Sequence, residues 1–234
     1  MIYNQNMTVE EIIKQSVKDI KFSNQRARRD WVRKMLNYYG GNGTNKYIKE
    51  YFSSSAFQEV PCYNANFTRR FINKMSRIYT VGTSRNVSNQ YDTLTMKKDA
   101  RFKHIERMTR LMGTVATQVI YKELNGVPYF DYRPVYYFDV HLSDPFTPNA
   151  IMYPLLMKSD DISDINKCEW AYWDESIYAH YDEDGNIINE YEHGYGVLPF
   201  VFTHREEQID EFFVDGANDI VDCNEQVNIA MTEM

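Results

Sequence analysis

The hydrophobic pattern of this 234-residue chain changes its period near residue 113. Before that point apolar residues recur at helical spacing, and from Thr114 to Tyr121 the chain turns to alternation and β-branched residues. Each period places apolar side chains on one face of one kind of backbone, so helices should give way to strands. Because no linker of Gly, Ser or Pro separates the two parts, we expect one α+β unit rather than two independent domains.

Start and stop signals bound the helices of the first part. Thr8-Val9-Glu10-Glu11 has the spacing of a capping box, and Gly40-Gly41-Asn42-Gly43 is typical of a helix C-terminus. A third substantial helix, ending before Gly82, has an apolar face made of Phe67, Phe71, Met75 and Ile78. The expected helices span residues 9–21, 24–39, 44–52, 67 to about 78, and 93–112, with a polar turn at 53–55 and a loop at 83–92.

The second part predicts mixed or antiparallel strands followed by a closing helix. Asn125-Gly126 is a strong hairpin signal, because both residues tolerate the positive φ of a type I′ turn. The expected strands span residues 114–123, 128–133, 136–142, 151–157, 169–173, 177–181, 187–193 and the proline-bearing 197–203. An amphipathic helix begins near Gly216 and shows no stop signal up to Met234, so we expect the natural protein to continue.

Composition excludes several classes of protein. The net charge of −7, from 33 acidic and 26 basic residues, argues against a chain that holds nucleic acid by neutralising phosphates. Three cysteines without CxxC spacing (Cys62, Cys168, Cys223) favour a reducing compartment. No signal-peptide pattern and no apolar stretch of about 18 residues is present, which predicts a chain that is neither secreted nor membrane-spanning. The 19 tyrosines fit subunit contacts, and they fit a coding bias equally well.

No motif predicts catalysis, a cofactor or a metal site. The five histidines have no HxxxH or HxH spacing, and no serine lies in a GxSxG motif. Asp182-Glu183-Asp184-Gly185-Asn186 faintly resembles a calcium loop but favours a hairpin turn, since it lacks the downstream glutamate. The basic cluster Arg26, Arg28, Arg29, Arg33 and Lys34 around Trp31 favours a solvated or intersubunit face over a nucleic-acid site.

Three segments together resemble the portal proteins of tailed bacteriophages. They are Asn64-Ala65-Asn66-Phe67 running through Phe71-Ile72-Asn73-Lys74 to Tyr79 and Gly82, the strand Gly196-Val197-Leu198-Pro199-Phe200-Val201, and Asp219-Ile220-Val221-Asp222-Cys223-Asn224. In portals of this kind an asparagine-led helix precedes a β-rich section, a Gly-x-Ile/Leu-Pro-Phe strand and an Ile-Asp-x-x-Asn helix. The order here is the same, over roughly residue 60 to the end.

The resemblance implies a structural subunit with no catalytic residue of its own. Such subunits form a ring, usually dodecameric, at one capsid vertex of the virion, through which double-stranded DNA is packaged and released. Implied partners are further copies of the chain, the major capsid protein, the terminase packaging motor and the head–tail adaptor. The whole of 1–234 would be a wing-like region, with a helix-rich part (1–112), a strand-rich part (113–203) and an acidic stretch leading to a stem-directed helix (204–234). Stem, clip and crown would lie beyond Met234.

Two alternatives stay open. One is a different capsid-associated or head-to-tail joining protein. The other is a metal-dependent hydrolase that uses the scattered carboxylates Asp139, Asp144, Asp182 and Asp184, although their spacing does not favour it.

Overall fold

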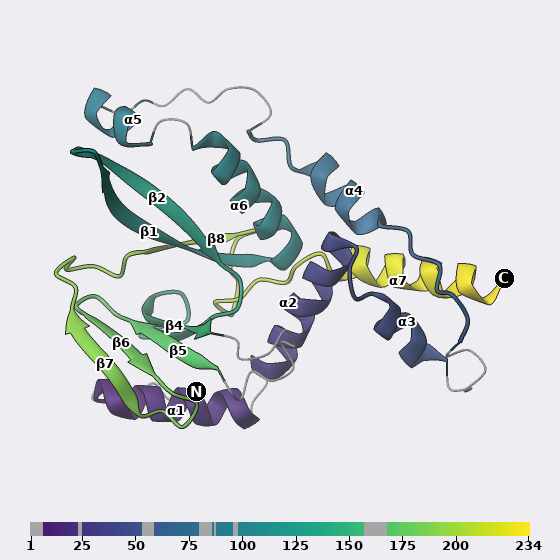
Figure 1. Cartoon of the computed structure of the whole chain (residues 1–234), viewed down its shortest axis with the longest axis horizontal. Coiled ribbons are helices and arrows are strands. Elements are labelled where there is room, and N and C mark those ends of the chain that lie inside the picture. Colours follow the sequence, from purple (N-terminus) through teal and green to yellow (C-terminus); the bar gives the residue numbers. More distant parts are fainter. Residues whose placement is uncertain are drawn as a thin grey trace. The chain divides into compact units, whose positions relative to one another are not determined.

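The structure is a computed structural model that describes residues 7–22, 25–52, 59–79, 86, 88–95, 98–156 and 168–234. The side chains of residues 16–26, 90, 92 and 93 are outside this description, as are the expected turn at 53–55, Gly82, residues 83–85 and 87 of the expected loop, and residue 157 of the fourth expected strand. Residues 89–92, expected in that loop, are helical instead, because they form the start of α5 (Asn89–Thr95). Helices and antiparallel sheets make up the chain, which confirms the predicted α+β class (Figure 1).

Seven helices and eight strands are described. The helices are α1 (Val9–Phe22), α2 (Gln25–Gly40), α3 (Asn45–Tyr51), α4 (Phe67–Met75), α5 (Asn89–Thr95), α6 (Asp99–Met112) and α7 (Asn218–Glu233). The strands are β1 (Thr114–Leu124), β2 (Val127–Val135), β3 (Asp139–Leu142), β4 (Pro148–Leu156), β5 (Glu169–Trp173), β6 (Ile177–Tyr181), β7 (Ile187–Glu192) and β8 (Phe200–His204).

The chain divides into two compact units, each made of two separate stretches. The sheet unit contains residues 1–30 and 115–214, and the helical unit contains residues 31–114 and 215–234. The change of sequence period near residue 113 therefore falls where the chain passes from the helical unit to the sheet unit. The final stretch returns to the helical unit, so α7 packs among helices that precede it by more than a hundred residues.

The sheet unit has hydrophobic residues on both faces of a five-stranded antiparallel sheet of order β3-β4-β5-β6-β7. One face, carrying Met152, Trp170 and Tyr172, packs against Ile13 of α1. The opposite face packs against residues of β1, β2 and β8, which form a second sheet of order β2-β1-β8. Alternation along β4 supplies both faces, since Met152 points to one and Ile151 to the other.

Most local signals in the sequence are confirmed. The Thr8 amide donates to the Glu11 carboxylate (2.8 Å) and the Glu11 amide donates to the Thr8 hydroxyl (3.3 Å), which is the predicted capping box. Asn125 and Gly126 have φ of 53° and 77° and join β1 to β2. Gly41, with φ of 76°, follows the last residue of α2.

Several expected elements have different bounds. The helix expected to include Ile78 ends at Met75, because Ser76 is buried and adopts an extended backbone. The helix expected over 93–112 is two helices, since Lys98 has non-helical dihedrals and α6 begins after it. The strand expected over 197–203 begins only at Phe200, because Pro199 has no amide hydrogen to donate to a neighbouring strand.

The strand expected over 136–142 begins at Asp139. Phe138, just before it, is fully buried in the hydrophobic cluster, and its carbonyl accepts a hydrogen bond from the Arg28 guanidinium. That carbonyl therefore bonds to a side chain of α2 instead of to a neighbouring strand.

In the helical unit, Gly216 allows the close approach that leads into α7. A β-carbon at this position would lie 2.3 Å from the backbone carbonyl oxygen of Leu111 in α6. The same oxygen accepts a hydrogen bond of 2.8 Å from the Ala217 amide. Only glycine fits here without displacing backbone, so Gly216 sets the position from which α7 starts.

Candidate assembly surface

Helix α7 is attached to the segment before α4 by a row of buried polar side chains. Asn224 and Asn228 are 2% and 0% exposed, and Thr232 continues the row at four-residue spacing. Because residues four apart lie on one face of a helix, these three side chains form a single polar stripe. The stripe faces the chain between Tyr63 and Thr68 and provides hydrogen bonds to its backbone.

Asn224 has the most complete set of bonds. Its Oδ1 accepts from the Thr68 amide (2.9 Å) and the Thr68 hydroxyl (3.0 Å), and its Nδ2 donates to the Ala65 carbonyl (2.7 Å). Thr68 lies in the first turn of α4, where the amide has no partner within its own helix. Asn224 therefore caps α4 from another helix.

Asn228 and Thr232 continue the attachment toward the start of the segment. Asn228 Oδ1 accepts from the Ala65 amide (3.0 Å), and the Thr232 hydroxyl accepts from the Tyr63 amide (2.9 Å). Alternate residues of an extended segment point the same way, so Tyr63 and Ala65 both present their amides to α7. Asn66 then caps α4, with its Oδ1 accepting from the Arg69 amide (2.9 Å).

An ionic contact holds the other side of α7 to α2. Lys34 donates to Glu225 (2.7 Å) and to Asp222 (3.4 Å), and the Tyr38 hydroxyl donates to Glu225 (3.3 Å). Burial raises the pKa of Tyr38, and the nearby Glu225 carboxylate raises it further. Tyr38 therefore stays protonated as the donor.

These contacts rotate α4 and α7 so that apolar residues face outward. The predicted apolar face of α4 is wrong, since Phe71 and Met75 are 53% and 43% exposed while Thr68 and Ile72 are buried. On α7, Val227 and Met231 are likewise exposed. The polar side chains are buried because they bind backbone groups, and a helix that turns one face inward must turn the other outward.

The outward residues border an apolar groove of about 270 Å³. Phe67 and Phe71 of α4 form one wall, and Ile220, Cys223 and Val227 of α7 form the other. Met75 and Met231 extend the two walls at helical spacing. We call these seven residues the α4–α7 face.

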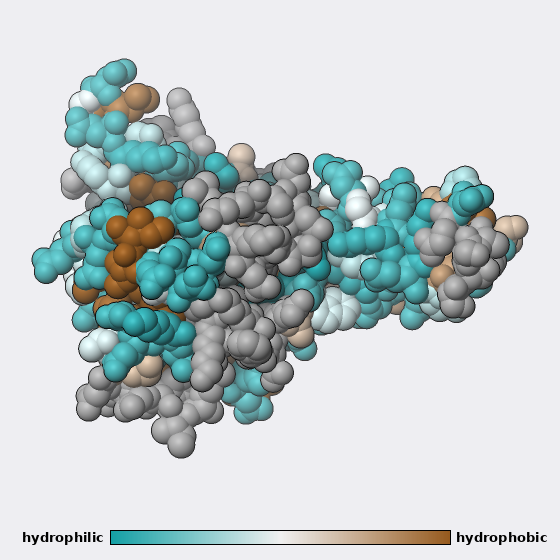
Figure 2. Space-filling view, turned by 60° about the horizontal axis from the view of Figure 1, so that its bottom comes forward, coloured by the Kyte–Doolittle hydropathy of each residue, from teal (hydrophilic) through white to brown (hydrophobic). Residues whose placement is uncertain are grey.

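Exposed aliphatic residues also occur on the sheet unit. Figure 2 shows some hydrophobic residues among hydrophilic ones on the visible face of the chain. In the sheet unit, Leu124 and Val127 beside the β1–β2 turn and Ile188 on the edge strand β7 are exposed. Glu190 and Glu192 are exposed on the same edge strand, and such charges oppose pairing with another strand.

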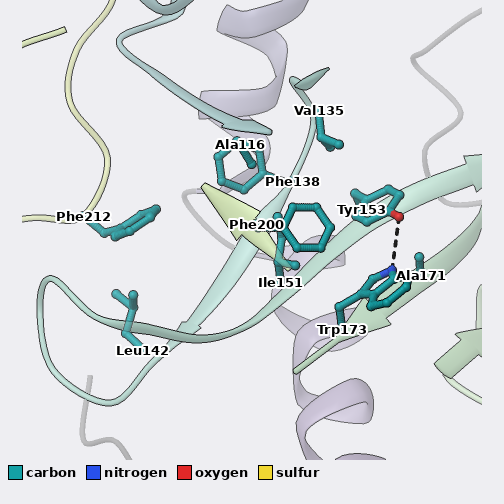
Figure 3. Close-up of a cluster of buried hydrophobic side chains, with 10 residues drawn as sticks. All are labelled: Ala116, Val135, Phe138, Leu142, Ile151, Tyr153, Ala171, Trp173, Phe200 and Phe212. Atoms are coloured by element: carbon teal, nitrogen blue, oxygen red, sulfur yellow. Dashed lines mark hydrogen bonds between the residues drawn. The ribbon is translucent and has the colours of Figure 1, made fainter. Parts of the chain in front are cut away.

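The second segment of the resemblance, Gly196–Val201, lies in the sheet unit and supplies core packing. Phe200 is 8% exposed and packs with Tyr153 and Trp173, whose indole Nε1 donates to the Tyr153 hydroxyl at 3.1 Å (Figure 3). The carbonyl of Pro199 accepts from the Val119 amide at 2.9 Å. Gly196–Val201 is therefore an architectural segment here.

Arg28 and Arg29 of the basic cluster do not form the solvated or intersubunit face that the sequence predicted, and the Arg26 side chain lies outside the described residues. Arg29 is 2% exposed and pairs with Asp139, which also accepts from Arg28 at 3.0 Å. Burial lowers the pKa of both guanidinium groups to about 9, which leaves them protonated at neutral pH. The prediction was wrong because it took every arginine as exposed, whereas a carboxylate within the same unit neutralises two of them.

Three of the four carboxylates of the hydrolase alternative, those of Asp139, Asp144 and Asp182, have structural partners. Asp139 binds the two arginines, and Asp144 accepts from the amides of Phe146 (2.8 Å) and Thr147 (2.9 Å). Asp182 accepts from the Asn186 amide (2.9 Å), which confirms the predicted hairpin turn.

Two further observations concern chemistry and membranes. Within the part of the chain that the structure describes, no three His, Cys, Asp or Glu residues form a group that could hold a metal ion. Among those same residues, no helix combines the length and apolar character needed to cross a membrane.

A larger hollow of about 630 Å³ in the sheet unit is bordered by Tyr172, Asp174 and Ser176. Asp174, one of its acidic residues, accepts hydrogen bonds from the Ser176 amide (2.8 Å) and from the Tyr172 hydroxyl (3.1 Å). These bonds hold the turn between β5 and β6.

Comparison with known proteins gives no family. No model of a known protein family matches the chain, and no curated protein matches it significantly.

Proposed function

We propose that this chain is a structural subunit of a portal-type ring at a phage capsid vertex, forming a conduit for double-stranded DNA. The observation that carries the proposal is the attachment between two of the three portal-like segments. Asn224 of the last segment, which is buried, bonds to the backbone of Ala65 (2.7 Å) and of Thr68 (2.9 Å) in the first segment, and both segments lie in the helical unit. If these segments resembled the family only by chance in their order, no hydrogen bonds between them would be expected.

The exposed apolar residues of α4 and α7 support a role in assembly. A subunit whose surface is completed only by neighbours keeps apolar residues outside when it is alone. Phe71, Val227 and Met231 are such residues, and they lie on helices that are otherwise tightly bonded. The surface fits a subunit of a larger particle.

The acidic balance of the chain supports a conduit instead of a DNA clamp. Affinity for duplex DNA comes mainly from Lys and Arg that neutralise phosphates, and this chain has a net charge of −7. A weakly repelling or weakly binding lumen lets DNA slide. In the proposed assembly the chain is also the platform for the terminase motor and the head–tail adaptor, and it is held in the shell by the major capsid protein.

Imaging of purified particles tests the proposal. The full-length gene product is expressed, purified and viewed by negative-stain electron microscopy, with class averages analysed for rotational symmetry. We expect rings with an open axial hole. A product that stays monomeric at micromolar concentration, or one that turns over a substrate in a defined pocket, would contradict the proposal.

A further inference from the structure

We infer that the α4–α7 face is the surface through which one copy of this chain binds the next, with α4 of one copy lying against α7 of its neighbour. The inference rests on the proposed function, because it names where subunits of the ring meet. Three observations support it: the apolar groove, the burial of polar residues on the inner side of α7, and the opposite charges of the two helices.

The first step concerns the cause of the exposed apolar face. In most surface helices the polar residues face water and the apolar residues face the core. Helix α7 does the reverse at two positions, since it buries Asn224 and Asn228 and exposes Val227 and Met231. The buried amides have partners, so this arrangement is stable in one copy, and the apolar stripe is left for another molecule to cover.

The charges of the two helices identify that molecule. Helix α4 contains Arg69, Arg70 and Lys74 and no acidic residue. Helix α7 contains Asp219, Asp222, Glu225 and Glu233 and no Lys or Arg. Asp222 and Glu225 are paired with Lys34, so Asp219 and Glu233 are the charges of α7 that a neighbour can meet. The basic α4 of one copy can therefore lie against the acidic α7 of the next.

Other pairings of the same surface are disfavoured. Two α4 helices facing each other would bring Arg70 and Lys74 near their own counterparts, and two α7 helices would do the same with Asp219. Among the residues that the structure describes, the side chains of Arg70 and Lys74 form no ion pair within the chain. Both charges are therefore available to a neighbour, and like-with-like pairing leaves them repelling.

The pairing also explains how a closed ring could form. Contact between two different surfaces of identical chains is heterologous, and it produces a ring when the rotation closes. The alternative, a two-fold dimer with both grooves facing, uses the same residues and stops at two copies. Counting the copies distinguishes these outcomes.

Charge reversal in the full-length protein tests the inference. One variant reverses α4 (Arg70→Glu with Lys74→Glu), and a second reverses α7 (Asp219→Lys with Glu233→Lys). The second variant leaves both contacts of Lys34, with Asp222 and with Glu225, in place. The matched control (Lys46→Glu with Arg101→Glu) reverses two exposed cations elsewhere in the helical unit.

We expect each reversed variant alone to lose assembly, seen in sedimentation velocity as at least a tenfold rise in the concentration needed for half-assembly. The control should assemble as the unchanged chain does. Mixing the two reversed variants should restore assembly, because every α4–α7 contact between alternating copies then joins opposite charges. Val227→Asp, which places a charge on the apolar wall, should also prevent assembly, and circular dichroism should show each variant folded.

The outcomes separate this inference from the proposed function. Rings that persist in both reversed variants and in Val227→Asp would overturn the inference and leave the ring proposal standing. Dimers of the unchanged chain that the variants dissociate would support the face and overturn the ring. A folded monomer of the unchanged chain would overturn both, and a mixture that stays dissociated would overturn the α4-to-α7 pairing.

Discussion

Removing the Asn224 side chain tests whether the polar row of α7 holds the helical unit together. Asn224→Ala deletes an acceptor for the Thr68 amide and a donor to the Ala65 carbonyl, both backbone groups at buried or half-buried positions. An unsatisfied buried backbone group costs about 1–3 kcal/mol. Asn228 still reaches the Ala65 carbonyl at 3.4 Å, so that loss is partly compensated. We expect a total loss of about 2–4 kcal/mol in the free energy of unfolding.

Equilibrium urea unfolding, followed by circular dichroism, measures this loss. Gln226→Ala is the matched control, because it truncates an exposed amide on the same helix and should change stability by no more than about 0.5 kcal/mol. Thr68→Val removes only the hydroxyl contact and should cost about 1 kcal/mol. If Asn224→Ala were no more destabilising than Gln226→Ala, the hydrogen bonds of the row would contribute nothing measurable to stability and the reasoning would fail.

Further predictions concern the backbone, the buried ion pairs, pH and DNA. Gly216→Ala places a carbon 2.3 Å from a backbone oxygen and should lower the thermal midpoint strongly, whereas Gly126→Ala meets no atom within 4 Å and should cost less. Asp139→Ala leaves Arg28 and Arg29 without their carboxylate and should cost about 3–5 kcal/mol in urea unfolding. Burial lowers the pKa of His104, so its contribution to stability is present above the pKa of the unfolded chain and is lost as the pH falls through the pKa of the folded chain. Unfolding midpoints at pH 8 should therefore exceed those at pH 5. The variant His104→Gln should reduce that difference. Gel-shift titrations of the full-length product with duplex DNA should show weak binding that weakens further with salt, and tight salt-independent binding would contradict the conduit proposal.

Local backbone chemistry was predictable from the sequence. The capping box at Thr8, the Asn125-Gly126 turn and the glycines after α2 each depend on residues within a few positions of one another. Such signals require no knowledge of distant partners. The same reason explains why the Asp182 loop was correctly predicted as a turn, since its bonds close within four residues.

Helix faces were less predictable because they depend on distant residues. The apolar spacing of Phe71 and Met75 indicated a buried stripe, and the structure buries Thr68 and Ile72 instead. No local rule indicates that Asn224 would bind Thr68 at the start of α4, so that Phe71 and Met75 are left exposed. A buried asparagine at four-residue spacing with another, as in Asn224 and Asn228, was the available signal, and it can be read only once α7 is known to pack on α4.

The sequence by itself determined the kinds of elements and most of their bounds, because φ preferences, capping and side-chain period act over a few residues. Only the tertiary structure decided which faces are buried, that Arg29 lies in a core beside Asp139, and that α7 joins helices from the first half of the chain. Those outcomes depend on long-range pairing of polar groups, whose partners must be satisfied once they leave water. Periodicity records how apolar a face is, and it contains no information about which distant group will bind the opposite one.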